Sequence, residues 1–531
     1  MSHRLIRVGN DFETSLINRI PIVALTMDAE KVYQRRWVIL GILSLSLIIT
    51  FLNNVTLNVA IPELSEDLRV DNTEIQWIID AYIIVFGGLL LVMGALGDKF
   101  GRKRALLLGL VIIGVVSGST AQLADSSEDL ILARGLMGVG AALVMPATLS
   151  LIVVIFPKEE RGKAVGVWVA MAGIGNPLGL IVGGYLVEAY DWRWVFWINP
   201  PLTALAIVCA IALIPDSKDD NDIPLDPVGS VLSILALTSI MYAIIEAPEL
   251  GWTSMETIGI GLCGICLLVV FIWWESSIDY PLLSMVFFRD SRFTMGLVAI
   301  TLAFFVMFTF MFTQMLHFQY VRGHSPFEAS LRFLPLPLGL MPAAVNSDRL
   351  CRKFGNNNVV SAGLALVSIG MLIFTTVEVD TPYFRLALIF MLLGAGMGLA
   401  MAPSTTLVMD SIPHDKAGVG SATNDTSREL GGAFGIAIGG SVLNEIYQSS
   451  LVVPDGLDGF SDQVTSSFPA AIGIGKELVL QGNPMGNQLI ENANVAFMDG
   501  MTGSAVVLAL VALINSIFVK LYMPRRSASG D

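Results

Sequence analysis

A charged turn that contains glycine lies between two apolar runs, each long enough to cross a lipid bilayer. The turn spans residues 94–104 and reads Gly-Ala-Leu-Gly-Asp-Lys-Phe-Gly-Arg-Lys-Arg. Its glycines permit close backbone approach, and its bases are typical of a short loop on the cytoplasmic side of a membrane. The segment therefore predicts two membrane-spanning helices joined by a tight turn and argues against a loop of a soluble protein.

Similar apolar runs recur along almost the whole chain. Hydrophobic residues make up 54% of the 531 residues, charged residues make up 14%, and the mean hydropathy is +0.70. This composition leaves too little polar surface to cover a soluble globule. Spans drawn over apolar stretches of about 18 or more residues predict fourteen helices and an all-α polytopic membrane protein. The spans ending near 245 and 346 are the least secure, and losing both would leave twelve.

The distribution of positive charge predicts the orientation of these spans. With both chain ends in the cytoplasm, most of the 31 Lys and Arg residues lie on the inner side, as the positive-inside rule requires. We therefore expect a multi-pass protein of the plasma (inner) membrane with both termini cytoplasmic. Arg428 falls within a span. The bases left on the outer side are Arg69, Arg134, Arg193, Arg322, Arg332, Arg385 and Lys476.

The expected organisation is two six-helix halves joined by two extra helices. Residues 1–36 form a cytoplasmic extension without an apolar core long enough for a cleaved signal. The halves cover 37–214 and 293–522, and the linking helices cover 228–274. The longest segment outside the membrane, 448–493, is rich in Gly, Ser, Pro and Asp and predicts a flexible loop or small cap on the outer side.

Ionisable residues inside the spans are the main functional candidates, because each charge in the membrane costs at least about 2.5–3.5 kcal/mol. Asp80 lies roughly 8–9 Å below the outer end of the second span at the rise of an α-helix. It is the first candidate for proton coupling. The alternative is a hydrated acid near the end of a helix.

A second group of ionisable residues lies in the thirteenth span. Asp425, Arg428 and Glu429 fall at positions i, i+3 and i+4 and share one helix face. Two close carboxylates rarely ionise alike, and Arg428 can neutralise one and leave the other able to exchange a proton. The alternative is a salt-bridged cluster at the cytoplasmic end of the helix.

Aromatic and methionine side chains are suited to an adaptable cavity for flat, lipophilic cations. We select Tyr82, Phe305 and Phe312 as substrate-binding candidates. Most of the other aromatic residues, including Phe304 and Phe308, are expected to face lipid or the core.

The sequence shows no signature of a cofactor or catalytic site. The four cysteines lack a second pair or a neighbouring histidine that would suggest a metal site. No nucleotide-binding loop indicates an enzyme or an ATP-driven protein. We expect no metal, no cofactor and no nucleic-acid partner, and a monomer in the lipid bilayer.

Several motifs resemble the fourteen-helix drug:proton antiporter branch of the major facilitator superfamily, over about residues 37–522. The 94–104 turn is similar to the family's helix 2–3 signature, and 134–142 resembles its helix 4 motif. Residues 348–355 are similar to 98–104, which favours two related halves. The helix 5 antiporter motif is matched, although Leu180 stands in place of proline, by Gly175, Gly179, Gly183 and Gly184.

The resemblance implies two halves that pivot about a site near the membrane midplane. It gives Arg134 a part in proton transfer and gives Asp80 a part in cation recognition or proton exchange. Glycines at four-residue spacing allow close helix approach, either for plain packing or for a sliding interface. A conformational latch between cytoplasmic helix ends is expected from Gly94, Asp98, Gly101, Arg102 and Lys103.

One departure from the family pattern concerns Asn53, which stands where the helix 1 motif usually has aspartate. Asn53 can hydrogen-bond a substrate but cannot hold a proton or pair with a cation, which favours monocationic or neutral substrates. The resemblance thus implies a proton-driven multidrug exporter of lipophilic, monocationic compounds that works by alternating access. The alternatives are a dedicated exporter of one metabolite, such as an amino acid, siderophore or antibiotic, and a non-transporting membrane sensor.

Overall fold

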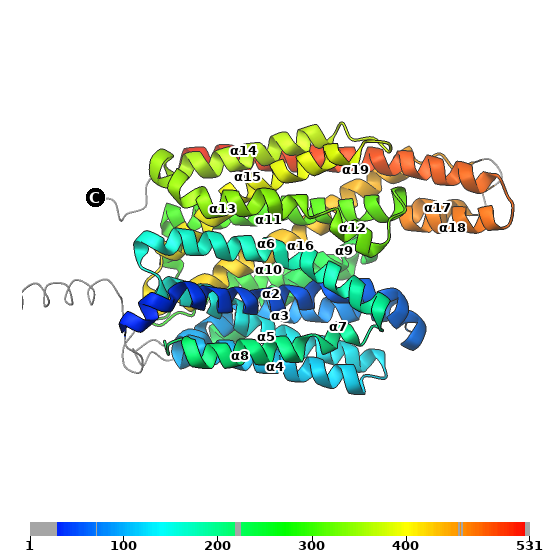
Figure 1. Cartoon of the computed structure of the whole chain (residues 1–531). Helices are drawn as coiled ribbons and strands as arrows, with labels where there is room; N and C mark the ends of the chain where they lie inside the picture. The colour runs from blue at the N-terminus through cyan, green and yellow to red at the C-terminus, as the bar shows by residue number, and fades with distance from the viewer. Residues whose placement is uncertain are drawn as a thin grey trace, which may run out of the picture.

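The protein is described by a computed structural model covering residues 29–68, 70, 72–217, 225–454, 457 and 460–525. Every regular element in these ranges is helical, and the long helices run side by side in one bundle (Figure 1). Most of the expected N-terminal extension, together with Arg69, lies outside the described residues.

The first half begins with a long helix and continues through tight turns. Gly101 separates the second and third helices with a φ of 114°, a backbone conformation that other residues rarely adopt. Ser126 starts a later helix by accepting a hydrogen bond from the backbone N–H of Asp129. The helices are α2 (Ala29–Leu68), α3 (Asn72–Phe100), α4 (Arg102–Leu123), α5 (Ser127–Ile155), α6 (Lys158–Ala189), α7 (Trp194–Trp197) and α8 (Asn199–Leu213).

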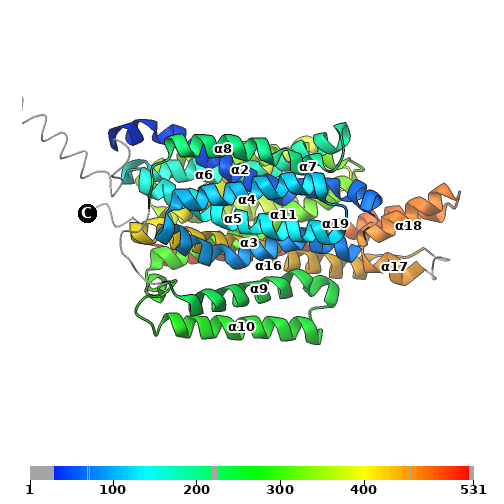
Figure 2. The same ribbon diagram turned by 90° about the horizontal axis from the view of Figure 1, so that it is seen from below.

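Two linking helices form a hairpin on the side of the bundle (Figure 2). They are α9 (Pro227–Leu250) and α10 (Met255–Glu275). Asp226 and Ser254 cap their first turns by accepting hydrogen bonds from backbone N–H groups. α9 packs against α3 and against α16 (Ala417–Ser450) of the second half, whereas α10 lies outside α9.

The second half contains α16 and the remaining helices. A π-helical turn continues the first long helix of this half. The other elements are η1 (Met285–Arg289), α11 (Ser291–Leu316), η2 (His317–Val321), α12 (Pro326–Leu331), α13 (Pro335–Phe354), α14 (Asn356–Phe374), α15 (Tyr383–Asp410), η3 (His414–Lys416), α17 (Ser461–Ser466), α18 (Phe468–Leu480) and α19 (Met485–Tyr522).

Twelve helices in the described ranges are long and apolar enough to cross a membrane. One of the twelve is α9, which corresponds to the expected span ending near 245. The helices α13 and α16 are not among the twelve, because charges at the end of α13 and glycine and polar residues in α16 lower their apolar character. Both run beside the other long helices (Figure 1). The expected number of fourteen spans therefore stays a prediction.

Much of the 448–493 segment, for which a flexible loop or a small cap was expected, is helical. α16 continues to Ser450, α17 and α18 follow, and α19 already begins at Met485. Phe468 of α18 stacks on Phe497 of α19 with ring centroids 4.2 Å apart. These helices extend beyond the bundle at the end opposite to the one where α2 begins and α19 ends (Figure 1). We call the latter the closed end, for the contacts described below.

Candidate functional site

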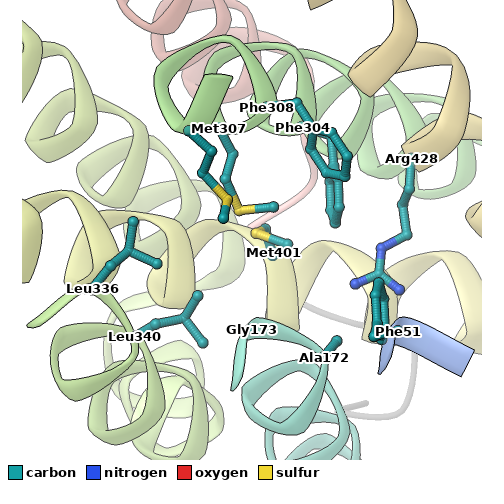
Figure 3. Close-up of a pocket in the computed structure, with 11 residues that line it drawn as sticks. Phe51, Ala172, Gly173, Phe304, Met307, Phe308, Leu336, Leu340, Met401 and Arg428 are labelled. Atoms are coloured by element: carbon teal, nitrogen blue, oxygen red, sulfur yellow. The ribbon is translucent and has the colours of Figure 1, made fainter. Parts of the chain in front are cut away.

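A small cavity lies between the two halves (Figure 3). Its volume is about 20 Å³, which is room for about one water molecule. Sites for drug-sized molecules enclose roughly 300–1,000 Å³. In this conformation the cavity is therefore too small for a drug-sized molecule. Its wall is formed by Phe51, Ala172, Gly173, Phe304, Met307, Phe308, Met311, Leu336, Leu340, Met401 and Arg428.

The aromatic wall comes from one face of α11. Phe304 and Phe308 lie on the cavity, one helical turn apart. Phe305 is rotated by about 100° from Phe304, and its backbone faces Gly435 of α16. Phe312 is 38% exposed. In this conformation the two expected binding residues, Phe305 and Phe312, thus lie outside the cavity wall, and their neighbours on the helix take that place.

Arg428 supplies a buried positive charge to the cavity wall. Its side chain is 1% exposed and reaches from α16 toward Phe51 (Figure 3). The guanidinium lies 4.7 Å from the ring centroid of Trp168 and 4.6 Å from that of Phe304. Two aromatic faces thus stabilise the cation by cation–π attraction.

Asp425 pairs with Arg428, as the i, i+3 spacing predicts. The pair is loose, with 3.6 Å between Nη1 and Oδ1, and Asn424 donates to the same Oδ1 at 3.1 Å. Among the described residues, no hydrogen bond of normal geometry reaches the other carboxylate oxygen of Asp425 or Nη1 of Arg428, both of which are buried. Such atoms are rare in folded proteins and costly. This part of α16 thus has buried polar atoms that can still bind a proton or form hydrogen bonds with a substrate or water.

Glu429 is the third ionisable residue of this face of α16. It is half-buried and acts electrostatically on Arg428 of its own helix and on Tyr82 of α3. It therefore joins the Asp425 group on α16 to the first half of the bundle.

Arg134 is the corresponding buried cation of the first half. It is 1% exposed and donates to the backbone carbonyls of Ile78 at 3.1 Å and Asn53 at 2.6 Å. Its guanidinium lies 4.4 Å from the ring centroid of Tyr82, and its Nη2 has no hydrogen-bond partner among the described residues. Arg134 thus ties α5 to α2 and α3.

Asp80 lies close to this cation. It is 7% exposed and acts electrostatically on Arg134. Tyr82, two residues further along α3, donates its hydroxyl to the carbonyl of Thr50 at 3.1 Å. The burial of Asp80 argues against the alternative of a hydrated acid at the helix end.

Asn53 faces α8 and not the cavity. Its amide and that of Asn199 donate to each other at 3.1 and 2.9 Å. Asn199 also donates to the hydroxyl of Ser117 at 2.9 Å. The sequence analysis missed both partners of this network, which occupies the hydrogen bonds that Asn53 was expected to offer a substrate.

The 94–104 turn connects the two halves at the closed end. Asp98 accepts hydrogen bonds from the backbone N–H groups of Gly418 at 2.8 Å and Val419 at 3.0 Å. Arg102 pairs with Asp98 at 2.6 Å and donates to the carbonyl of His414 at 2.7 Å. A carboxylate at the first turn of α16 is favoured by the helix dipole. We call this group of residues the Asp98 contact.

Gly94 and Lys103 of the same turn have different surroundings. A Cβ at Gly94 would lie 2.5 Å from the carbonyl oxygen of Gly418 and 2.6 Å from Cβ of Ala422, so α3 and α16 approach closely only with glycine there. Lys103 donates to the carbonyl of Ile211 in α8 at 3.1 Å. Lys103 thus takes no part in the contact across the halves.

A second contact between the halves lies at the closed end. Asp348 and Arg352 form an ion pair on α13. A Cβ at Gly162 of α6 would lie 2.6 Å from Oδ1 of Asp348, and Arg352 donates to the carbonyl of Glu159 at 3.1 Å. The similarity between 348–355 and 98–104 therefore has a structural counterpart, because each acid lies against the start of a helix of the other half.

The helix 5 glycines serve two kinds of contact. Gly175, Gly179 and Gly183 lie against α2 of the same half, with no room for a Cβ. This arrangement is the plain-packing alternative. Gly184 instead lies against Phe327 of α12 in the second half, so it belongs to a surface between the halves.

The profile that defines the Major Facilitator Superfamily matches residues 43–436. The chain belongs to the major facilitator superfamily. It is therefore a multi-pass membrane protein of a family of transporters, not of enzymes.

Curated relatives of this superfamily match most of the chain. The multidrug efflux pump LfrA of Mycolicibacterium smegmatis is 33% identical over 488 residues, covering 91% of this chain and 96% of LfrA. The methyl viologen resistance protein SmvA of Salmonella typhimurium is 32% identical over 426 residues, covering 80% and 86%. The human organic anion transporter MFSD10 is similar in structure, with a TM-score of 0.59, 13% identity and coverage of 93% and 100%. The last match shows the fold alone.

Proposed function

We propose that this protein is a proton-coupled multidrug efflux antiporter of the fourteen-helix branch that exports lipophilic, monocationic compounds. The observation that carries this proposal is a buried charged group in each half. Arg134 with Asp80 forms the first, and Arg428 with Asp425 and Glu429 forms the second. The names of LfrA and SmvA, a multidrug efflux pump and a methyl viologen resistance protein, support drug-like substrates.

In this mechanism a buried acid alternately binds a substrate cation and a proton. Asp80 releases substrate on the outer side, takes up a proton there and gives it up on the inner side. Exchanging one proton for one monocation moves no net charge, so the pH gradient supplies about 1.4 kcal/mol per unit. The neutral pair of Asn53 and Asn199 adds no second proton site, which fits a one-proton cycle.

The proposed orientation places the closed end in the cytoplasm of the cell. That end carries the Asp98 contact and bases of the 94–104 turn, as the positive-inside rule favours. Both chain ends are then cytoplasmic, and α17 and α18 lie on the outer side. Alternating access requires the contacts at the closed end to break, so that the site between the halves becomes accessible from the cytoplasm.

The test uses proteoliposomes with an imposed pH gradient and no voltage, and it follows ethidium movement. Native protein should transport ethidium, and Asp80→Asn should lose gradient-driven flux because the neutral side chain cannot exchange a proton. Glu188→Gln is the control, since it removes an exposed acid near the same end of the bundle. Flux that survives Asp80→Asn would transfer the coupling role to Asp425 or Glu429.

A dedicated exporter of one metabolite is the second candidate. The neutral amide pair of Asn53 and Asn199 favours it, because this part of the site offers no charge to a cationic drug. Native protein that moves no ethidium under any gradient would support this candidate and contradict the multidrug proposal.

A further inference from the structure

Two buried carboxyl groups meet at the closed end of the linking hairpin. Asp226 directly precedes α9 and is 7% exposed, whereas Glu275 ends α10 and is 2% exposed. The two groups lie within hydrogen-bonding distance of each other. A Cβ at Gly229 would collide with an oxygen of each, so glycine is required beside them. The two acids therefore share one small space under the first turn of α9.

The hydrogen bonds around these acids leave one position unfilled. Asp226 accepts from the backbone N–H of Gly229 at 2.9 Å and from the indole N–H of Trp274 at 3.0 Å. Glu275 Oε2 accepts from the backbone N–H of Leu283 at 2.8 Å. Glu275 Oε1, the oxygen beside Asp226, is buried and receives no hydrogen bond from the residues that the structure describes. The unfilled position thus lies between the two carboxyl groups.

Among the residues that the structure describes, neither acid is paired with a positive charge. Asp226 is the charged group that acts most strongly on Glu275, and the backbone N–H groups of Leu282 and Leu283 also point at this carboxyl group. Two buried carboxylates in contact cannot both ionise readily. A proton on one carboxyl group, donated to the other, removes the repulsion and fills the empty position.

A bound divalent cation fits these residues less well. Calcium and magnesium require six or more oxygen ligands. Here the N–H groups of Gly229, Trp274 and Leu283 already point at the carboxylate oxygens. A shared proton agrees with such surroundings.

We propose that Asp226 and Glu275 share one proton and form a pH-sensitive clasp between the two ends of the linking hairpin. Loss of the proton to water at the closed end leaves two adjacent carboxylates, whose repulsion separates the start of α9 from the end of α10. The residues next to Glu275, Ser276 and Ser277, are exposed, so water has a short path to the pair.

The clasp lies next to the Asp98 contact. Leu283, whose backbone is held by Glu275, packs with Leu282 in a small apolar cluster that includes Leu91 of α3 and Val419 of α16. The backbone N–H of Val419 is one of the two donors to Asp98. Opening the clasp therefore removes support from the first turn of α16 and favours opening of the closed end. This inference goes beyond the proposed transport function and does not depend on it.

Infrared spectroscopy of the full chain in lipid nanodiscs tests for the proton directly. The absorption of protonated carboxyl groups is recorded across a pH titration for native protein, Glu275→Gln and Asp226→Asn. Each amide keeps the size of the acid it replaces, and the amide oxygen introduced by Asp226→Asn can still cap α9, so both variants should fold. We expect Glu275→Gln to lose one protonated-carboxyl band, and Asp226→Asn to shift that band because Glu275 then faces an amide, whereas native protein loses the band as the pH rises. Unchanged bands in both variants would overturn the proposal.

Thermal unfolding gives a second measurement that a purely structural role would not reproduce. The folded native protein holds a proton that the unfolded chain releases, so its Tm should fall as pH rises through the titration of the pair. Glu275→Gln should remove this slope. Glu256→Gln, an exposed acid at the other end of α10, should keep it. A slope that persists in Glu275→Gln, or one that appears only when magnesium is removed, would contradict a shared proton.

Discussion

His414 is a single residue at the closed end whose protonation should weaken the contact between the halves. Its carbonyl accepts a hydrogen bond from Arg102. Burial lowers the pKa of His414 from its ordinary value of 6.5, and the charges of Arg161, Lys158 and Arg102 lower it further. The folded state therefore binds this proton less readily than the unfolded chain does. Its stabilising effect is complete above pH 6.5 and is lost as the pH falls toward the lowered pKa.

We therefore predict an acid-side loss of stability that depends on His414. The Tm of native protein should fall as the pH is lowered from 7 toward 5, and His414→Gln should reduce this fall because glutamine gains no charge. Differential scanning fluorimetry in detergent measures both. An equal fall in native protein and variant would contradict the assignment to His414.

Sequence reasoning succeeded for residues that interact along one helix. The pair of Asp425 and Arg428 follows from i, i+3 spacing, and the structure contains it. Asn199 and Ser117 could not be found in this way, because their amide and hydroxyl meet Asn53 only after α2, α4 and α8 have packed. Phe304 and not Phe305 lines the cavity. Which of the two does so depends on how α11 is rotated about its axis against the neighbouring helices, and the sequence does not give this rotation.

α3 and α16 cross in close contact because Gly94 has no side chain at the crossing point. We predict that Gly94→Val opens the closed end, since its side chain would overlap Gly418 and Ala422. Overpacking of this kind costs about 1–3 kcal/mol, which corresponds to roughly a 5- to 150-fold shift in the conformational equilibrium. Gly97→Ala is the control, because its Cβ would make only an ordinary contact at 3.5 Å.

Accessibility of a buried cysteine reports this opening. Ile412 lies near the closed end and is 7% exposed. In a chain whose four native cysteines are replaced, Ile412→Cys should react faster with a water-soluble maleimide when Gly94→Val is present. A rate equal to that of the Gly97→Ala control would show that the crossing does not hold this end shut.

Individual elements were predictable to the extent that they are apolar throughout. The long spans of the first half follow directly from hydropathy, as does α9. α18 is a helix of 13 residues, too short to be recognised as a span, and its packing on α19 decides its conformation. The Gly, Ser, Pro and Asp residues of 448–493 suggested a flexible loop or small cap. The composition of the whole segment hides the short helices within it.

At the scale of the whole molecule, the closed end is held by several contacts, which include a 2.7 Å ion pair between Arg161 of α6 and Asp410 of α15 and the two described above. One of these two joins Asp98 to α16, and the other joins Asp348 to α6. We predict that a disulfide across the second contact stops transport. A Cβ at Gly162 would lie 3.1 Å from Cβ of Asp348, close to the spacing of about 3.5–4.5 Å that a disulfide needs. A small backbone shift should therefore allow the bond.

The experiment uses Gly162→Cys with Asp348→Cys in a chain without the native cysteines. Oxidation should abolish substrate flux in proteoliposomes, and reduction should restore it. Gly162→Cys alone is the matched control and should be insensitive to oxidant. Full flux in the oxidised double variant would mean that the halves need not separate at this end.

The small cavity sets a limit on how tightly this protein can hold a substrate. A volume of about 20 Å³ admits no drug-sized molecule, so substrate must bind to a conformation in which this cavity is larger. If such a conformation makes up about 1% of the population, the measured Kd is about 100-fold weaker than the intrinsic one. Substitutions that loosen the closed end should then strengthen apparent binding while they impair turnover. High affinity in a variant would accordingly indicate a damaged transport cycle.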